Sequence, residues 1–219
     1  MISLSIFCSS DSVSLALFNK EKEIFFLSHK SKSKNKSELL IPLIQKLFEN
    51  FDYRNLSYIY FSRGPGSFTS IRTLVSIAQG IRLSSKAKIL TTTIFKVFLN
   101  EILKKKKPVL FLYRDSRKDF YFQFYDCVDS EFMNVSRILS GDVSKIKEKA
   151  RKFQHAKKIT ELYVFSNEEH KDIIDIPRIK FQKLSIDARN IFRACYNGFS
   201  SKRMNIIYHH PHYGKRISN

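Results

Sequence analysis

Hydrophobic and polar residues alternate in the first part of the chain. Residues 2–6 and 13–17 place apolar side chains at every second position, with serines between most of them. A more continuous apolar run at residues 24–27 follows a short polar turn. A period of two predicts strands, and the short turns between them predict an antiparallel meander.

A helical pattern begins after the polar, lysine-rich residues 29–36. Ser37 suits a helix N-cap, and Glu38 suits the positive end of the helix dipole. The apolar residues that recur at helical spacing are Leu40, Leu43, Ile44, Leu47, Phe48 and Phe51. Leu39 and Ile41 lie off this stripe, so the predicted helix has apolar surface on more than one side.

Strands and helices alternate in the next segment. A strand is predicted at 56–61 and a short one at 88–91, with a helix at 94–103. A further helix lies between the strands and is marked by Ile71, Leu74, Val75, Ala78 and Ile81. The order βββαβαβα predicts an α/β protein of the actin-like, ribonuclease-H-like fold, with mixed sheets flanked by helices.

The pattern weakens in the second half. Residues 109–113 and 120–125 predict a strand pair about a polar turn, whereas after Asp126 only a strand at 162–165 and a helix at 186–196 are indicated. We therefore predict two lobes, residues 1–104 and a smaller, diverged lobe at 105–219.

Charge points to a polyanionic partner. Lys and Arg number 39 against 20 Asp and Glu, which gives a formal charge of +19, and nucleic acid is the natural ligand of such a field. The chain shows no signal peptide and no apolar run long enough for a bilayer, and its three cysteines form no CxxC pair. We expect a reduced, cytoplasmic protein with no membrane association. The cluster of His209, His210 and His212 is interpreted as part of a flexible tail, because zinc ligands prefer wider spacings.

The sequence RGPGSFTSIR at residues 63–72 is the strongest candidate for chemistry. Glycines ahead of hydroxyls, between a strand and a helix, suit an anion site, with Gly64, Gly66, Ser67 and Thr69 as candidates. No lysine completes a P-loop, and Thr69 stands where a dinucleotide fingerprint needs glycine. The serine is not flanked by two glycines, as a nucleophile elbow requires. A tight turn that caps a helix is the other interpretation.

Several segments together resemble one bacterial family, TsaB (YeaZ). GPGSFT at 64–69, followed by Ile71 and Arg72, resembles that family's signature after a strand. The weaker similarities are SSDSVSLAL at 9–17, KSELLIPLI at 36–44, RDSRKDFYF at 114–122 and HPHYGKR at 210–216.

The resemblance implies a noncatalytic subunit of the machinery that makes threonylcarbamoyladenosine beside the tRNA anticodon. Such a subunit binds and activates the catalytic TsaD, works with the ATPase TsaE, meets tRNA through the complex, and can form a homodimer alone. ATP and threonylcarbamoyl-adenylate then belong to the partner subunits, and no catalytic residue, cofactor or metal is expected here. The implied partner interface comprises Ser37, Glu38, Leu40, Leu43, Ile44, Leu47, Ile71, Arg72, Leu74 and Val75.

The chain departs from the family pattern at three positions. Phe7 replaces the usual aspartate of the first turn, Lys36 replaces a histidine, and Ser70 replaces a glycine. An apolar Phe7 cannot ligate Mg²⁺, which favours the noncatalytic hypothesis. The alternative is a stand-alone ATPase or glycoprotease-like enzyme of the same superfamily, and nonspecific RNA binding is supported by charge only.

Overall fold

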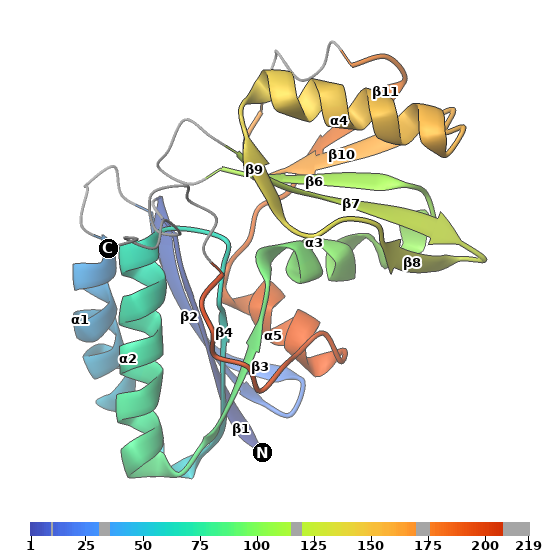
Figure 1. The fold of residues 1–219 in the computed structure, drawn as a ribbon. Helices are drawn as coiled ribbons and strands as arrows, with labels where there is room; N and C mark the ends of the chain where they lie inside the picture. Colours follow the sequence, from blue (N-terminus) through green and yellow to red (C-terminus); the bar gives the residue numbers. More distant parts are fainter. Residues whose placement is uncertain (10, 31–35, 115–119, 170–175, 208–219) are drawn as a thin grey trace, which may run out of the picture. The chain divides into compact units, whose positions relative to one another are not determined.

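The computed structural model describes residues 1–9, 11–30, 36–114, 120–169 and 176–207, without the side chains of Lys36 and Ser37. Two compact units divide this part of the chain (Figure 1). The first comprises Met1–Glu101 and Ile186–Ile207, and the second contains Ile102–Ser185. The sequence prediction placed one boundary at residue 104, whereas the structure returns the segment after Ser185 to the first unit.

The first unit is built on a five-stranded sheet of order β3-β2-β1-β4-β5. Its strands are β1 (Ile2–Cys8), β2 (Ser12–Asn19), β3 (Lys22–Lys30), β4 (Leu56–Ser62) and β5 (Lys88–Thr92). The first three strands pair antiparallel, and β1, β4 and β5 pair parallel. The parallel strands need crossover helices, as the alternating sequence pattern predicted. This is the ribonuclease-H-like order.

Among the described residues, four helices belong to the first unit. They are α1 (Lys36–Phe48), α2 (Phe68–Ser85), α3 (Ile94–Ile102) and α5 (Ala188–Tyr196). A 3₁₀ turn, η1 (Tyr53–Asn55), precedes β4. The helices α1 and α2 lie side by side on one face of the sheet, and α5 lies on the other (Figure 1).

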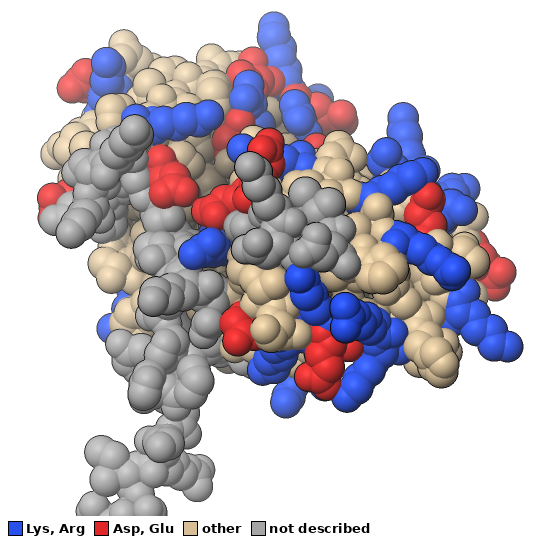
Figure 2. All heavy atoms as spheres, turned by 90° about the horizontal axis from the view of Figure 1, so that it is seen from above, with Lys and Arg blue, Asp and Glu red and all other residues tan. Residues whose placement is uncertain are grey.

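The second unit contains a sheet of order β11-β10-β6-β7-β8, with β9 paired to β7. Its strands are β6 (Val109–Tyr113), β7 (Phe120–Val128), β8 (Glu131–Asn134), β9 (Leu139–Gly141), β10 (Leu162–Ser166) and β11 (Ile179–Lys183). The 3₁₀ turn η2 (Leu103–Lys105) precedes β6, and the helix α4 (Val143–Ala156) follows β9. Figure 2 shows one face of the molecule, on which Lys and Arg side chains outnumber Asp and Glu side chains.

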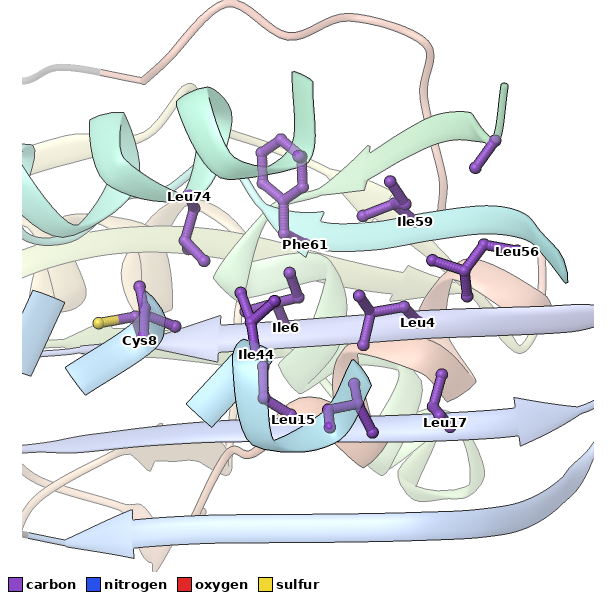
Figure 3. Close-up of a cluster of buried hydrophobic side chains, with 14 of the residues drawn as sticks. Leu4, Ile6, Cys8, Leu15, Leu17, Ile44, Leu56, Ile59, Phe61 and Leu74 are labelled. Carbon is purple, nitrogen blue, oxygen red and sulfur yellow. The ribbon is translucent and has the colours of Figure 1, made fainter. Parts of the chain in front are cut away.

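The core of the first unit lies between the sheet and the pair α1 and α2. Alternate residues of β1, β2 and β4 point into it (Figure 3): Leu4, Ile6, Cys8, Leu15, Leu17, Ile59 and Phe61. Val13 of β2 belongs to the same cluster. The helices contribute Leu40, Ile44, Leu47, Leu74 and Ala78. The apolar side chains that recur at every second strand position therefore pack against those that recur at helical spacing, in a single core. This confirms the prediction of strands and helices from the two patterns.

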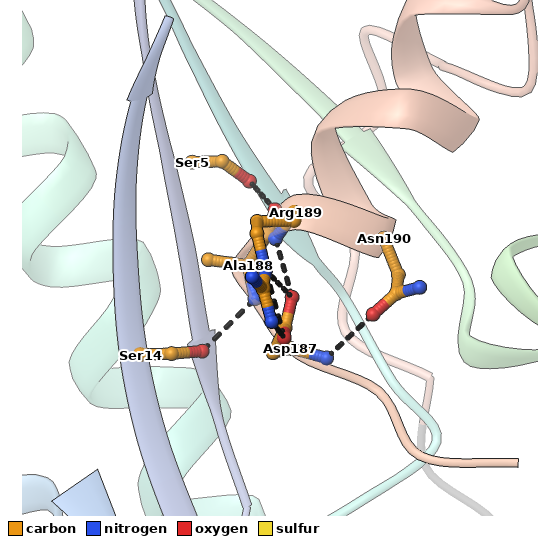
Figure 4. A network of polar contacts seen from close by, with 6 residues as sticks. All are labelled: Ser5, Ser14, Asp187, Ala188, Arg189 and Asn190. Carbon is orange, nitrogen blue, oxygen red and sulfur yellow. Dashed lines mark hydrogen bonds and ion pairs between the residues drawn. The ribbon is translucent and has the colours of Figure 1, made fainter. Parts of the chain in front are cut away.

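The helix α5 packs on the opposite face of the sheet, where it covers β1 and β2. Ser3, Ser5 and Ser14 are at most 1% exposed. The Ser5 hydroxyl donates to the carbonyl of Ala188 (2.6 Å), and the amide of Ala188 donates to Ser14 Oγ (2.9 Å; Figure 4). These two contacts hold the first turn of α5 against β1 and β2.

Aromatic packing and helix capping complete the placement of α5. The rings of Phe18 and Phe192 stack with centroids 3.7 Å apart. Asp187 caps the helix by accepting from the amide of Arg189 (2.8 Å), and its own amide donates to Asn190 Oδ1 (2.9 Å). Such a reciprocal arrangement satisfies donors that a helix start otherwise leaves unpaired, so the helix begins at a defined residue.

Four elements of the second unit, β8, β9, α4 and β11, have no clear signal in the sequence pattern. The helix α4 buries only Ile146, Ala150 and Phe153, and its other positions are mostly charged or polar. A narrow apolar stripe gives a weak periodic signal, and the three strands are five residues long or shorter.

Ser14→Ala tests the contact that holds α5. The substitution leaves the buried amide of Ala188 without its acceptor, and an unsatisfied buried donor costs about 1–3 kcal/mol. We expect the urea midpoint of the full chain to fall with an unchanged slope. Ser76→Ala, on the exposed side of α2, is the control and should change the free energy of unfolding by less than about 0.5 kcal/mol. Equal midpoints for the two variants would contradict the assigned role.

Candidate functional site

The glycine-containing loop connects the end of β4 to the start of α2. Gly64 is buried with φ of +109°, and the Gly64–Pro65 peptide bond is cis. The amide of Gly64 donates to Ser62 Oγ (3.2 Å), and its carbonyl accepts from the amide of Ile94 (3.1 Å). The loop thereby joins the start of α2 to the start of α3, and both polar groups of Gly64 are used inside the protein.

The hydroxyl candidates serve α2 itself. Ser67 Oγ accepts from the amide of Ser70 (3.4 Å), and the Ser67 carbonyl accepts from the amide of Ile71 (3.0 Å). Thr69 is exposed, and its carbonyl accepts from the hydroxyl of Thr73 (2.9 Å). Ser67 is therefore an N-cap, as the tight-turn interpretation predicted. Anion binding by Gly64, Gly66, Ser67 and Thr69 stays a prediction.

The C-terminal part of the described chain lies against this loop, a contact that no sequence pattern predicts. The amide of Ile207 donates to the carbonyl of Arg63 (3.0 Å), and Arg63 Nη1 donates to the carbonyl of Asn205 (3.1 Å). The Thr91 hydroxyl donates to the carbonyls of Ser201 and Arg203. Burial, together with the charge of Arg203, lowers the pKa of Arg63. No local sequence signal connects residues separated by more than a hundred positions.

Five residues of the predicted partner interface lie in the core instead. Leu40, Ile44, Leu47, Ile71 and Leu74 are at most 7% exposed. Their side chains face inward, so they cannot offer surface to another protein, and this part of the interface prediction needs correction. The reason is physical: the same apolar stripe that marks an amphipathic helix is the stripe that packs on the sheet.

The other predicted interface residues lie nearer the surface. Glu38 and Arg72 are exposed, and Leu43 and Val75 are half-buried against the core. The guanidinium of Arg72 lies over the ring of Phe68, 4.2 Å from its centroid. The side chain of Ser37 lies outside the described residues.

Exposed apolar side chains mark the outer surface of the helix pair. Ile41 of α1 is 55% exposed, and Leu83 near the end of α2 is 86% exposed. Ile41 is one of the residues that the sequence pattern placed off the main stripe. Ser70, where the chain departs from the family pattern, is buried, so its side chain points toward the protein interior.

The end of β1 carries no carboxylate. Phe7 is 4% exposed, and the nearest acid in sequence, Asp11, lies on an exposed turn. Within the described ranges, no three His, Cys, Asp or Glu side chains form a group that could hold a metal. The three C-terminal histidines lie outside these ranges. Burial raises the pKa of the Cys195 thiol to about 12, so this thiol stays protonated at neutral pH.

None of the helices in the described part of the chain combines the length and the hydropathy that a membrane crossing requires.

Comparison with known proteins identifies the family. Over 221 aligned residues the chain is 28% identical to the tRNA threonylcarbamoyladenosine biosynthesis protein TsaB of Buchnera aphidicola subsp. Acyrthosiphon pisum, covering 90% of this chain and 99% of the relative. The TsaB of Buchnera aphidicola subsp. Schizaphis graminum is 35% identical over 50% of this chain and 53% of its own. The family model described as "TsaD: tRNA N6-adenosine threonylcarbamoyltransferase" matches residues 29–190, more than half of the chain. The chain belongs to this family, as a protein of the TsaB (YeaZ) type.

Solved structures of the TsaB (YeaZ) type share the fold. YeaZ from Pseudomonas aeruginosa matches with a TM-score of 0.61 over 92% of this chain and 96% of that chain, at 15% identity. A second Pseudomonas aeruginosa structure, described as similar to peptidase YEAZ, gives a TM-score of 0.63 over 92% and 94%, also at 15% identity. The predicted fold class, with mixed sheets flanked by helices in two lobes, is confirmed.

Gly64→Ala tests whether the family's signature loop depends on glycine. A Cβ atom there would lie 3.1 Å from Ile71 Cδ1 and 3.3 Å from the carbonyl oxygen of Ile207, at a φ that other residues rarely adopt. We expect a loss of about 2 kcal/mol or more in the free energy of unfolding.

Gly80→Ala is the matched control for this loop substitution. Gly80 lies inside α2 with nothing within 4 Å of an added Cβ, so the same change should stabilise the helix by about 0.5–1 kcal/mol. Denaturant titration of both variants checks the pair. Similar effects at the two positions would contradict the loop assignment.

Proposed function

We propose that this chain takes part in tRNA threonylcarbamoyladenosine biosynthesis as a noncatalytic, cytoplasmic subunit that binds and activates a TsaD-type threonylcarbamoyltransferase. The observation that carries the proposal is the family match over residues 29–190, which includes α1, the glycine-containing loop and α2. The named TsaB relatives support the pathway.

The geometry of the helix pair supports a docking role. The helices α1 and α2 use their inner faces for the core, and they keep Ile41 and Leu83 exposed on the outside. Two adjacent helices with apolar residues on their outer surface can pack against a second helix pair as in a four-helix bundle. ATP and threonylcarbamoyl-adenylate would then bind to the partner subunits, TsaE among them, and not to this chain. When the TsaD-type partner is missing, the chain would self-associate through the same surface.

The signature loop supports a structural role in this proposal. Ser67 caps α2, and Gly64 connects the loop to α3 and, through Ile207, to the C-terminal segment. The loop thus fixes the position of α2 and of its exposed face. A small displacement of this helix would change the partner surface.

Ile41→Asp tests the partner surface. Ile41 is exposed in the monomer, so an aspartate there leaves the fold intact but places a charge in a predicted apolar contact, where burying an unpaired charge is costly. We expect the affinity for the host's TsaD-type protein to fall by about a hundredfold, since a cost of 2.8 kcal/mol corresponds to that factor. Isothermal titration calorimetry with the full-length proteins measures it.

Met133→Asp provides the matched control for partner binding. Met133 of β8 is 57% exposed, close to the value for Ile41, but it lies in the second unit. This variant should bind the partner as the unaltered chain does. If the unaltered chain does not bind a TsaD-type protein at micromolar concentration, the proposed function is wrong. If Ile41→Asp and Met133→Asp bind equally well, the partner uses another surface.

ATP turnover tests the alternative of a stand-alone enzyme. We expect the purified chain with Mg²⁺ to release no phosphate above the buffer rate, because a buried Phe7 stands where a metal-organising acid would be needed. A phosphate-release assay measures this. Turnover that disappears in Ser67→Ala would contradict the noncatalytic role.

A further inference from the structure

The helix α4 and the two residues that follow it, Lys157 and Lys158, form a strongly basic segment of the second unit. From Val143 to Lys158 the only acidic residue is Glu148. The basic residues are Lys145, Lys147, Lys149, Arg151, Lys152, Lys157 and Lys158. The apolar residues Ile146, Ala150 and Phe153 are buried on the sheet, so the charged side chains occupy the outer surface of the helix. This surface remained without a role in the proposed function.

Part of the charge is neutralised within the unit. Lys152 Nζ pairs with Glu148 at 2.6 Å, and Lys157 Nζ pairs with Asp126 at 3.0 Å. The hydrogen bond from Lys152 is the largest cause that lowers the pKa of Glu148, and the charges of Lys149 and Lys145 lower it further. The single carboxylate on the helix is thus already engaged. Over the described ranges, Lys149, Arg151 and Lys158 take part in no ion pair.

A pocket lies at the C-terminal end of α4, with a volume of about 660 Å³. Its lining consists of Arg151, Gln154, His155, Lys158, Ile159, Pro177 and Arg178. Gln154 Nε2 donates to the carbonyl of Pro177 (2.8 Å), which holds the Pro177–Arg178 turn against the helix. Arg151, Lys158 and Arg178 therefore bring three cations to one concave site, and none of the described residues that line it is a carboxylate.

We propose that this basic pocket and the neighbouring Lys149 bind backbone phosphates of RNA, and that in the proposed function the RNA is the tRNA to be modified. The identity of the RNA as tRNA rests on the proposed function, whereas the phosphate contact rests on the charge and geometry of the pocket. Arginine and lysine side chains that converge without a carboxylate attract phosphate groups. Contacts of this kind position a nucleic acid without reading its sequence.

The composition of the helix surface favours RNA over an anionic membrane. A helix that docks on a lipid surface inserts large apolar side chains among the head groups. The large apolar side chains of α4, Ile146 and Phe153, are instead buried in the core of the unit. The exposed residues are mainly lysine, arginine and other polar residues, which suit a hydrated polyanion.

Charge reversal of the pocket tests the proposal. The full chain with Arg151→Glu and Lys158→Glu is compared with the unaltered chain in fluorescence anisotropy titrations against a labelled tRNA transcript. Log affinity falls linearly with log salt, and each lost phosphate contact reduces the magnitude of this negative slope by about 0.7–0.9. We therefore expect the magnitude of the slope to decrease by about 1.5. The affinity at low salt should fall by about tenfold or more.

The control carries the same change of charge at another place. Lys22→Glu with Lys88→Glu reverses two exposed lysines of the first unit, and it should retain most of the affinity and the full salt slope. Equal losses in the two double variants would show binding by net charge alone and would overturn the proposal. No tRNA binding by the unaltered chain, or tighter binding to vesicles containing anionic lipid than to tRNA, would also overturn it.

Partner binding separates this inference from the proposed function. The α4 double variant should form the complex with the TsaD-type protein as well as the unaltered chain does, because α4 lies outside the helix pair proposed as the interface. Loss of tRNA affinity with intact partner binding supports both proposals. Loss of tRNA affinity in a chain that binds no TsaD-type protein supports the RNA surface and rejects the proposed function.

Discussion

The two hydrogen bonds between Ala188 and the serines of β1 and β2 hold α5 on the second face of the first unit's sheet. Ser5 and Ser14 lie on the sheet face opposite the main core, and the start of α5 accepts from one and donates to the other. Without a helix on this face, the sheet would expose Phe18 and Tyr60, both of which pack against Phe192. Residues 186–207, which follow the second unit in sequence, therefore belong to the first unit. The end of this segment, up to Ile207, lies against the signature loop.

The signature loop contacts the segment that ends at Ile207 and leads directly into α2, a helix of the proposed interface. Gly64 has its carbonyl bonded to α3 and approaches Ile207 closely, and the loop continues directly into the capped start of α2. The sequence of this loop resembles a phosphate site, but in the structure the loop connects α2, α3 and the segment that ends at Ile207. The start of α2 is thereby connected to α3 and to the segment that ends at Ile207.

The two units differ in how their surfaces are divided between core and exterior. In α1 and α2 the regular apolar stripe is buried in the core, and a few other apolar side chains, such as Ile41 and Leu83, are exposed. In α4 the apolar stripe is narrow, and the rest of the helix is basic. The first surface suits contact with another protein, and the second suits contact with a polyanion. One small chain can thereby present two different kinds of surface.

The sequence by itself determined the meander, the alternating strands and helices of the first unit, the strand pair β6 and β7, and a tight turn that caps a helix after residue 64, because these follow from local periodicity and turn chemistry. It also determined the family, through the letters at 64–72. Only the tertiary structure decided that Leu40, Ile44 and Leu74 face the sheet rather than a partner, since a helical stripe does not reveal what covers it. The burial of Ser5, the return of residues 186–207 and the pocket around Arg151 and Arg178 depend on contacts between segments far apart in the sequence. No local pattern encodes such contacts.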